Sequence, residues 1–186
     1  MTRPGTLILA SGLALALAAA CTKQSLQATY DKQSGYIEAF VQGQMKSDTT
    51  ATLRENGGAY RLLLHDTLKV QRDSLREGGL VSLYYACFTL TGSSVSRNNL
   101  VATNLKEVAR AAGWDLTDTT RYKLDTVRLD KNLLPGLRYG LEGVQAGDQG
   151  YILFTGKLGY ADTERGMIPA KSALAYQIWI DNVKNE

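Results

Sequence analysis

The chain has 186 residues, 44% of them hydrophobic, and a formal net charge of +3 at pH 7. This length allows one domain with a sizeable core and an extension, and the small charge excludes the strongly basic surface of a nucleic-acid-binding protein. With two cysteines and one histidine, the chain is neither a disulfide-rich scaffold nor a histidine-based zinc protein. We therefore expect no metal and no cofactor.

The first twenty residues have the pattern of an export signal. Arg3 gives a positive start, residues 7–20 (LILASGLALALAAA) are apolar, and Cys21 follows a run of small residues. The apolar run is too short for a membrane span and ends in a cleavage-like site. Small residues followed by cysteine resemble a bacterial lipobox, in which the cysteine is lipidated after cleavage. We predict a lipoprotein signal peptide over 1–20 and lipid attachment at Cys21. The alternative is an ordinary secretory signal that leaves Cys21 in the mature chain.

Residues 21–58 are predicted to form a lipid-anchored tether and a helix. CTKQSLQ (21–27) is polar, and residues 28–45 place Ile37, Phe40, Val41 and Met45 at helical spacing. Residues 46–58 are rich in turn formers and indicate a linker. No acidic run follows Cys21, so we expect the anchor to hold the protein in the bacterial cell envelope, facing the periplasm.

Several strands are predicted over residues 59–186. In the clearest, GGLVSLYYACFTLTG (78–92), period-two spacing places Val81, Leu83, Tyr85 and Cys87 on one face. Further strands are expected at 59–66, 67–73, 121–129, 150–156 and 172–183. His65 and Asp66 could suggest half of a catalytic triad, but a turn is favoured. The run 121–129 is interpreted as a solvated strand of mixed charge.

Two short helices are predicted between these strands. Asn104 and Glu107 form a capping-box pattern that begins a helix over 103–114. Pro135 suits the first turn of a second helix, and Gly147 suits its end. Strands interrupted by short helices predict an α+β domain with an antiparallel sheet.

Two parts of the sequence resemble a known family. The first is similar to the C-terminal half of FKBP-type peptidyl-prolyl isomerases; it comprises LLPGLRYGLEGVQAGDQGYILFTGKLGYA (133–161) and its continuation GMIPAKSALAYQIWIDNV (166–183). The second, residues 78–92, resembles the tyrosine-bearing strand of that family. The resemblance implies an antiparallel, half-wrapped sheet around a short helix. The helix predicted from its own spacing over 28–45 is an N-terminal helical extension outside this domain. The resemblance also implies an apolar pocket between helix and sheet, with no catalytic acid or base.

The pocket residues are carried over from the resemblance one by one. They are Tyr85, Val101, Leu133, Leu134, Leu137, Tyr160, Met167, Ile168 and Tyr176. Three positions depart from the family pattern. Leu137 stands where active members usually have tryptophan, Ala170 replaces the second proline of a Pro-Pro step, and the aspartate of a Phe-Asp pair is absent at Val101-Ala102 (or, by another alignment, Val95-Ser96).

The resemblance implies a peptidyl-prolyl cis-trans isomerase that helps exported proteins fold. Two alternatives remain open: a peptide-binding or chaperone module of the same fold without turnover, and a lipoprotein that uses the fold only as a scaffold. The expected partners are proline-containing or unfolded polypeptides and, through the lipid, a membrane. Nucleic acid and metal are not expected.

Overall fold

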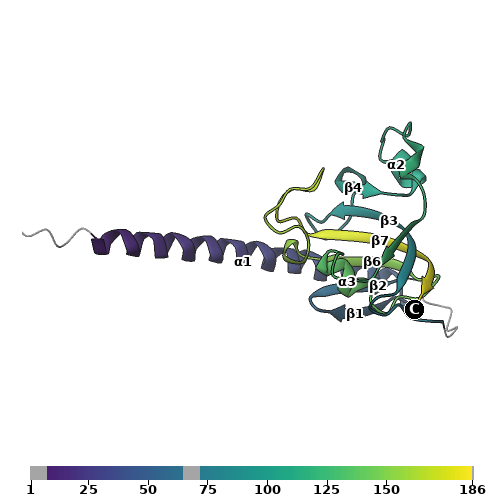
Figure 1. Cartoon of the computed structure of the whole chain (residues 1–186), viewed down its shortest axis with the longest axis horizontal. Coiled ribbons are helices and arrows are strands. Elements are labelled where there is room, and N and C mark those ends of the chain that lie inside the picture. Colours follow the sequence, from purple (N-terminus) through teal and green to yellow (C-terminus); the bar gives the residue numbers. More distant parts are fainter. Residues whose placement is uncertain (1–7, 65–71, 186) are drawn as a thin grey trace, which may run out of the picture.

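The computed structural model describes residues 8–64 and 72–185, with side chains from residue 24 onward. The expected strand 67–73 and the His65-Asp66 turn lie mostly outside the described residues. The helices are α1 (Ile8–Ser47), α2 (Lys106–Ala111) and α3 (Pro135–Leu141), shown in Figure 1. The strands are β1 (Thr52–Asn56), β2 (Ala59–Leu63), β3 (Leu80–Thr89), β4 (Leu100–Thr103), β5 (Asp125–Arg128), β6 (Gln149–Phe154) and β7 (Leu174–Lys184).

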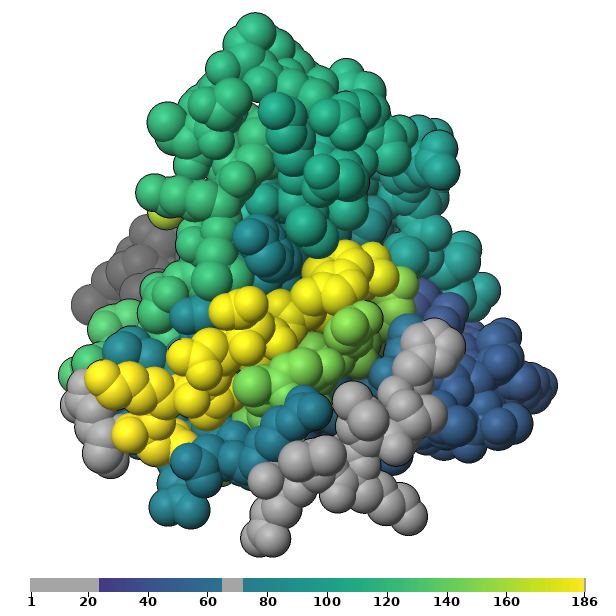
Figure 2. Space-filling model, turned by 90° about the vertical axis from the view of Figure 1, so that its right-hand side faces the viewer, coloured from purple at the N-terminus to yellow at the C-terminus, as the bar shows by residue number. Residues whose placement is uncertain are grey.

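These strands form one antiparallel sheet in the order β1-β2-β6-β7-β3-β4, and β5 pairs with the first half of β3. Figure 2 shows β7 in yellow beside β6 in light green, with the segment from β4 to β5 rising above them in teal and green. The short helix α3 lies against this sheet, and the N-terminal part of α1 projects away from it (Figure 1). The predicted α+β architecture, an antiparallel sheet around a short helix with a further N-terminal helix, is confirmed.

Strand β6 is buried on both of its faces. Ile152 and Phe154 belong to the core on the α3 side, whereas Tyr151 and Leu153 belong to a second core under α1. A strand covered on both faces reads as a continuous apolar run rather than an alternating one. This explains the run Tyr151–Phe154 in the middle of the sheet.

Helix α3 lies unusually close to β6 because two glycines face the strand. A Cβ built on Gly136 would lie 2.2 Å from the Phe154 ring, and one on Gly140 would lie 2.2 Å from Ile152 Cγ2. The helix is shorter than predicted, since it ends at Leu141 and not at Gly147. Gly143 takes the left-handed conformation beyond this end (φ +81°). There the buried Arg61 donates hydrogen bonds to the carbonyls of Gly140 and Glu142, at 3.3 and 2.6 Å.

Helix α1 is longer than predicted and packs onto the sheet. The helix over 28–45 is confirmed, but it continues through 21–27, where a polar tether was expected. Ile37 and Phe40 are buried, and the Phe40 ring meets Tyr151 edge-on at 4.9 Å. Met45, predicted on the same stripe, is 40% exposed. Within the described residues, no helix is both long and apolar enough to cross a membrane.

The linker expected over 46–58 is wrong for most of its length. Residues Thr52–Asn56 form β1, and Gly57-Gly58 turn the chain into β2. Both glycines have positive φ, which glycine adopts without a steric penalty. Residues 52–56 therefore belong to the sheet and not to an extension outside the domain, and a boundary at residue 58 would divide this hairpin.

The helix predicted over 103–114 exists, but its capping box does not. Asn104 is buried and serves the sheet instead: its Oδ1 accepts from the backbone N–H of Tyr85 at 2.7 Å, and its amide donates to the carbonyls of Leu83 and Lys123. Strand β4, which precedes this helix, pairs with β3. Asn104 thus joins the strand that carries Tyr85 to the start of α2.

Candidate functional site

A cavity of about 240 Å³ opens between α3 and the sheet. Six of the predicted pocket residues line it: Tyr85, Leu133, Leu137, Tyr160, Ile168 and Tyr176. Leu83, Ala102, Asp125, Val127 and Leu141 complete the lining. Apart from the tyrosine hydroxyls and the Asp125 carboxylate, these side chains are apolar, as is usual for a small-ligand pocket with a few polar groups that fix orientation.

Local structure explains how the lining comes together. Leu83 and Tyr85 are two residues apart on β3, so both point to the α3 side of the sheet. Leu137 and Leu141 are four residues apart on α3 and share its inner face. Tyr160, beyond the end of β6, reaches the cavity from the long connection between β6 and β7.

Three predicted residues do not line the cavity. Val101 and Leu134 are partly buried and pack against the core beside it, and Ala102 lines the cavity in place of its neighbour Val101. Met167 is 56% exposed, so Ile168 alone represents that segment in the lining.

Asp125 is the charged one among the five lining residues that the sequence did not predict. The run 121–129 was interpreted as a solvated strand, yet Asp125 on β5 pairs with Leu83 and lies in the cavity wall. A signal was present: Asp125, Val127 and Leu129 alternate on one face of the strand, and Leu129 is fully buried. The pocket therefore has a carboxylate, which the sequence did not predict, and it comes from a strand that was expected to face solvent.

Residues 72–181 match the sequence profile of the family described as FKBP-type peptidyl-prolyl cis-trans isomerase. The match covers more than half of the chain, including the whole cavity lining. The chain belongs to this family. The predicted enzyme class, peptidyl-prolyl cis-trans isomerase, is thereby confirmed at the level of the family.

Solved FKBP structures share the fold of this chain. The three FKBP domains of wheat FKBP73 have a TM-score of 0.56 and 14% identity, over 73% of this chain and 52% of that one, so this chain spans about half of the wheat structure. A peptidyl-prolyl cis-trans isomerase from Pseudomonas syringae has a TM-score of 0.55 and 13% identity, over 86% of this chain and 96% of that one. FkpA from Escherichia coli has a TM-score of 0.51 and 14% identity, over 98% of this chain and 75% of that one. No curated protein sequence matches the chain.

The FKBP pocket contains three tyrosines whose hydroxyls stay protonated at neutral pH. Burial raises the pKa of Tyr160 and Tyr85, and the Asp125 charge raises the pKa of Tyr85 further. Burial also raises the pKa of Tyr176 well above its usual value. The Tyr176 ring stacks on Phe154 at 5.9 Å and lies 6.0 Å from Tyr85. A protonated hydroxyl can donate to a carbonyl, so the pocket offers donors on an apolar, aromatic wall.

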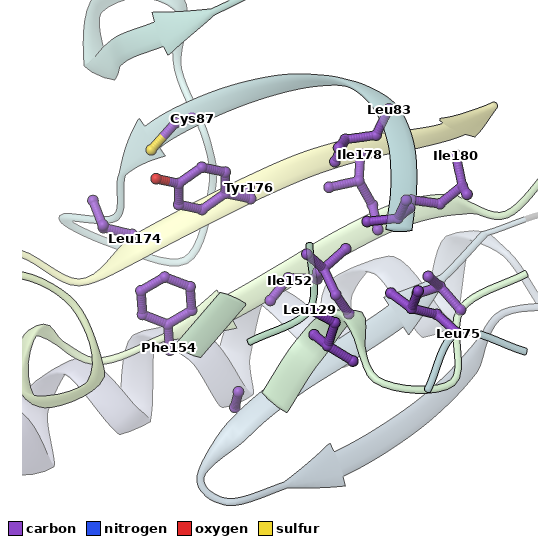
Figure 3. Packing of buried hydrophobic residues seen from close by; sticks show 14 of the residues in the cluster. Leu75, Leu83, Cys87, Leu129, Ile152, Phe154, Leu174, Tyr176, Ile178 and Ile180 are labelled. Carbon is purple, nitrogen blue, oxygen red and sulfur yellow. The ribbon is translucent and has the colours of Figure 1, made fainter. Parts of the chain in front are cut away.

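The free thiol of Cys87 lies directly behind this pocket. The Tyr176 hydroxyl points toward its sulfur (Figure 3). Burial raises the pKa of Cys87 to about 12. Because the thiolate is the reactive form, Cys87 is a core residue of the FKBP domain and not a nucleophile.

This burial predicts a loss of stability in alkali. The unfolded thiol deprotonates above a pKa of about 8.5, while the folded thiol keeps its proton up to about 12. The contribution of the buried thiol to the free energy of unfolding is therefore complete below pH 8.5 and is lost as the pH rises toward 12. Between pH 8.5 and 9.5 the wild type should lose about 1 kcal/mol more unfolding free energy than Cys87→Ala. Urea denaturation at both pH values measures this, and equal losses would contradict the prediction.

Two other hollows of similar size are less suited to proline than the FKBP pocket. Volumes of about 310 and 280 Å³ flank α1 on its two sides, and polar side chains such as Lys32, Gln33, Asp31 and Glu55 line them. A proline ring gains more from the apolar cavity beside α3. Over residues 8–64 and 72–185, no group of three His, Cys, Asp or Glu residues could hold a metal ion.

Proposed function

We propose that this chain is a lipid-anchored peptidyl-prolyl isomerase of the bacterial cell envelope, which speeds X–Pro isomerisation in exported polypeptides. The observation that carries the proposal is the apolar cavity beside α3, with tyrosine hydroxyls in its wall. Proline-containing polypeptides are the expected substrates, as for the family.

The chemistry requires no acid or base, because no bond is broken. The barrier of about 18–20 kcal/mol is the amide resonance lost on twisting, and unaided exchange takes tens to hundreds of seconds. An apolar pocket disfavours the dipolar planar amide relative to the twisted one. A fixed hydroxyl such as that of Tyr160 can hold the neighbouring carbonyl in the twisted geometry, so the donor acts most strongly on the transition state.

Catalysed exchange of a short X–Pro peptide tests the proposal. Exchange NMR measures the cis–trans rate with and without the mature protein, and needs no coupling protease. We expect a rate that rises in proportion to protein concentration. Peptide binding without faster exchange would indicate the alternative binding module, and neither binding nor faster exchange would indicate a scaffold.

Leu137 is the position where this pocket departs most from the family, and Leu137→Trp should make the enzyme faster. Leucine leaves the floor without an aromatic face for the proline ring. An aromatic contact is worth about 0.5–1.5 kcal/mol beyond its area, which corresponds to about a three- to tenfold higher kcat/KM. Overpacking can cost about 1–3 kcal/mol of stability, so a melt accompanies the assay. A folded variant with unchanged binding and turnover would contradict the role of Leu137 as the pocket floor.

The membrane anchor rests on the sequence pattern around Cys21. If the thiol is the acyl acceptor, the mature protein begins at Cys21, carries lipid and sediments with membranes. Cys21→Ser should leave unprocessed or soluble protein. Mass spectrometry of the mature N-terminus, together with fractionation, measures this. A mature chain that starts elsewhere, without acyl mass, would overturn the anchor and leave an ordinary export signal.

A further inference from the structure

The connection between β6 and β7, residues 155–173, is named here the pocket loop. It carries Tyr160 and Ile168 into the cavity. Its middle is open to solvent, since residues 162–167 are all exposed. Besides the packing of Tyr160 and Ile168 against the core, the contacts that fix the loop lie at its base, where its two ends meet.

The base is closed by backbone contacts. The N–H of Ala161 donates to the carbonyl of Gly156 at 2.9 Å, and the N–H of Lys171 donates to the carbonyl of Ala161 at 2.5 Å. Ala161 and Lys171 both have positive φ, at 48° and 60°, a conformation rare for residues with side chains. A Cβ on Gly156 would lie 2.5 Å from the Lys171 backbone. Tyr160 is thus the sequence neighbour of Ala161, which makes both hydrogen bonds of this base.

One side chain of α1 reaches both ends of this base. The amide nitrogen of Gln33 donates to the carbonyl of Lys171 at 2.5 Å, and its amide oxygen accepts from the N–H of Gly156 at 2.9 Å. Gln33 is only 8% exposed and precedes the buried Ile37 by one helical turn. A buried amide is costly unless its hydrogen bonds are made. Gln33 makes one hydrogen bond with each end of the loop, which explains why a polar residue is buried on an otherwise apolar stripe.

We propose that Gln33 is a positioning residue of the proline pocket: through the base of the pocket loop it sets where Tyr160 and Ile168 lie. This inference rests on the proposed isomerase function. Gln33 thereby affects catalysis without touching the substrate, because it holds the loop that carries Tyr160, the proposed donor. A misplacement of about 1 Å can cost about 10²-fold in rate, so a looser base lowers turnover without emptying the pocket.

Gln33→Leu in the full mature chain is the first test. It keeps the size of the side chain and removes both hydrogen bonds. We expect kcat/KM for an X–Pro peptide to fall by about tenfold, with most of the loss in kcat, because the hydroxyl acts on the twisted amide. Trypsin should also cut the pocket loop faster, at Lys157, Arg165 or Lys171. Val41→Ala is the matched control: Val41 is buried on the same helix and has no hydrogen bond to the loop. At a temperature where both variants are fully folded, the control should keep wild-type kcat and cleavage rates.

Gln33→Glu adds a pH readout. A charged carboxylate can still accept from the Gly156 N–H but cannot donate to the Lys171 carbonyl, whereas a protonated one can do both. The activity of this variant relative to wild type should therefore rise as the pH falls through the glutamate pKa. The relative activity of Gln33→Leu should stay flat.

The outcomes separate this inference from the proposed function. Wild-type kcat and cleavage rates in a folded Gln33→Leu would overturn it, and so would equal losses in Val41→Ala, which would assign the effect to helix packing. If the wild type neither binds nor isomerises the peptide, the proposed function fails, and the cleavage rates alone decide about Gln33. Faster loop cleavage in Gln33→Leu than in Val41→Ala would then still support the role of Gln33 in holding the base of the pocket loop.

Discussion

Replacing Phe40 with alanine is expected to destabilise the protein by about 3–5 kcal/mol, as for other buried aromatic residues. Phe40 is 2% exposed and meets Tyr151 edge-on, within the cluster that also contains Leu62, Leu153 and Ala175. Its removal would leave a cavity between α1 and the sheet. Urea denaturation of the mature chain measures the change in the free energy of unfolding.

The same helix provides the control for this prediction. Met45 is 40% exposed, so Met45→Ala should change stability by no more than about 0.5 kcal/mol. By the same reasoning, a chain that begins near Asn56 should lose its cooperative melt, because the apolar face of Leu62 and Leu153 would meet water. Equal, small effects of Phe40→Ala and Met45→Ala would contradict the packing of α1 and restore the view that it stands apart.

Gly140→Ala is the second substitution with a large expected effect, a loss of about 1–3 kcal/mol or more. The added Cβ would lie 2.2 Å from Ile152 Cγ2 and 3.1 Å from Ile152 Cβ. Ile152 is fully buried in mid-sheet, and its branched side chain has few rotamers to escape into. Helix α3 must then move away from β6, which widens the proline pocket. We therefore expect weaker peptide binding together with a lower melting temperature.

Gly43 is the matched control for Gly140. It lies in α1 with nothing within 4 Å of a built Cβ, and it is exposed. Gly43→Ala should stabilise the protein by about 0.5–1 kcal/mol, from helix propensity alone. If Gly140→Ala were as benign as Gly43→Ala, the close approach of α3 to β6 would be wrong.

The parts of the fold that sequence reasoning found are those set by local periodicity or by the family resemblance. Tyr85 follows from the period-two pattern of β3, and Tyr160 and Ile168 follow from the resemblance, since nothing local distinguishes a loop tyrosine that enters a pocket. The partner of α1 was not predictable. An apolar stripe with Ile37 and Phe40 looks the same whether it covers its own sheet or another protein.

Two misses left a signal in the sequence. The stretch Asn56-Gly57-Gly58 between two short runs is a hairpin pattern, and it could have identified β1 within the supposed linker. The alternation of Asp125 with Val127 and Leu129 could have placed the acid on the inner face of β5. Gln33 left no such signal, because its partners are backbone groups more than 100 residues away.

The central claim, that the cavity beside α3 binds and isomerises proline peptides, is tested most directly by locating where such a peptide binds. An amide NMR titration of the mature protein with a short X–Pro peptide, observed together with cis–trans exchange of that peptide, measures both site and function. We predict shifts concentrated at Tyr85, Leu137, Tyr160 and Ile168, with exchange faster than in free peptide. Shifts confined to the hollows beside α1, or exchange no faster than in buffer, would contradict it.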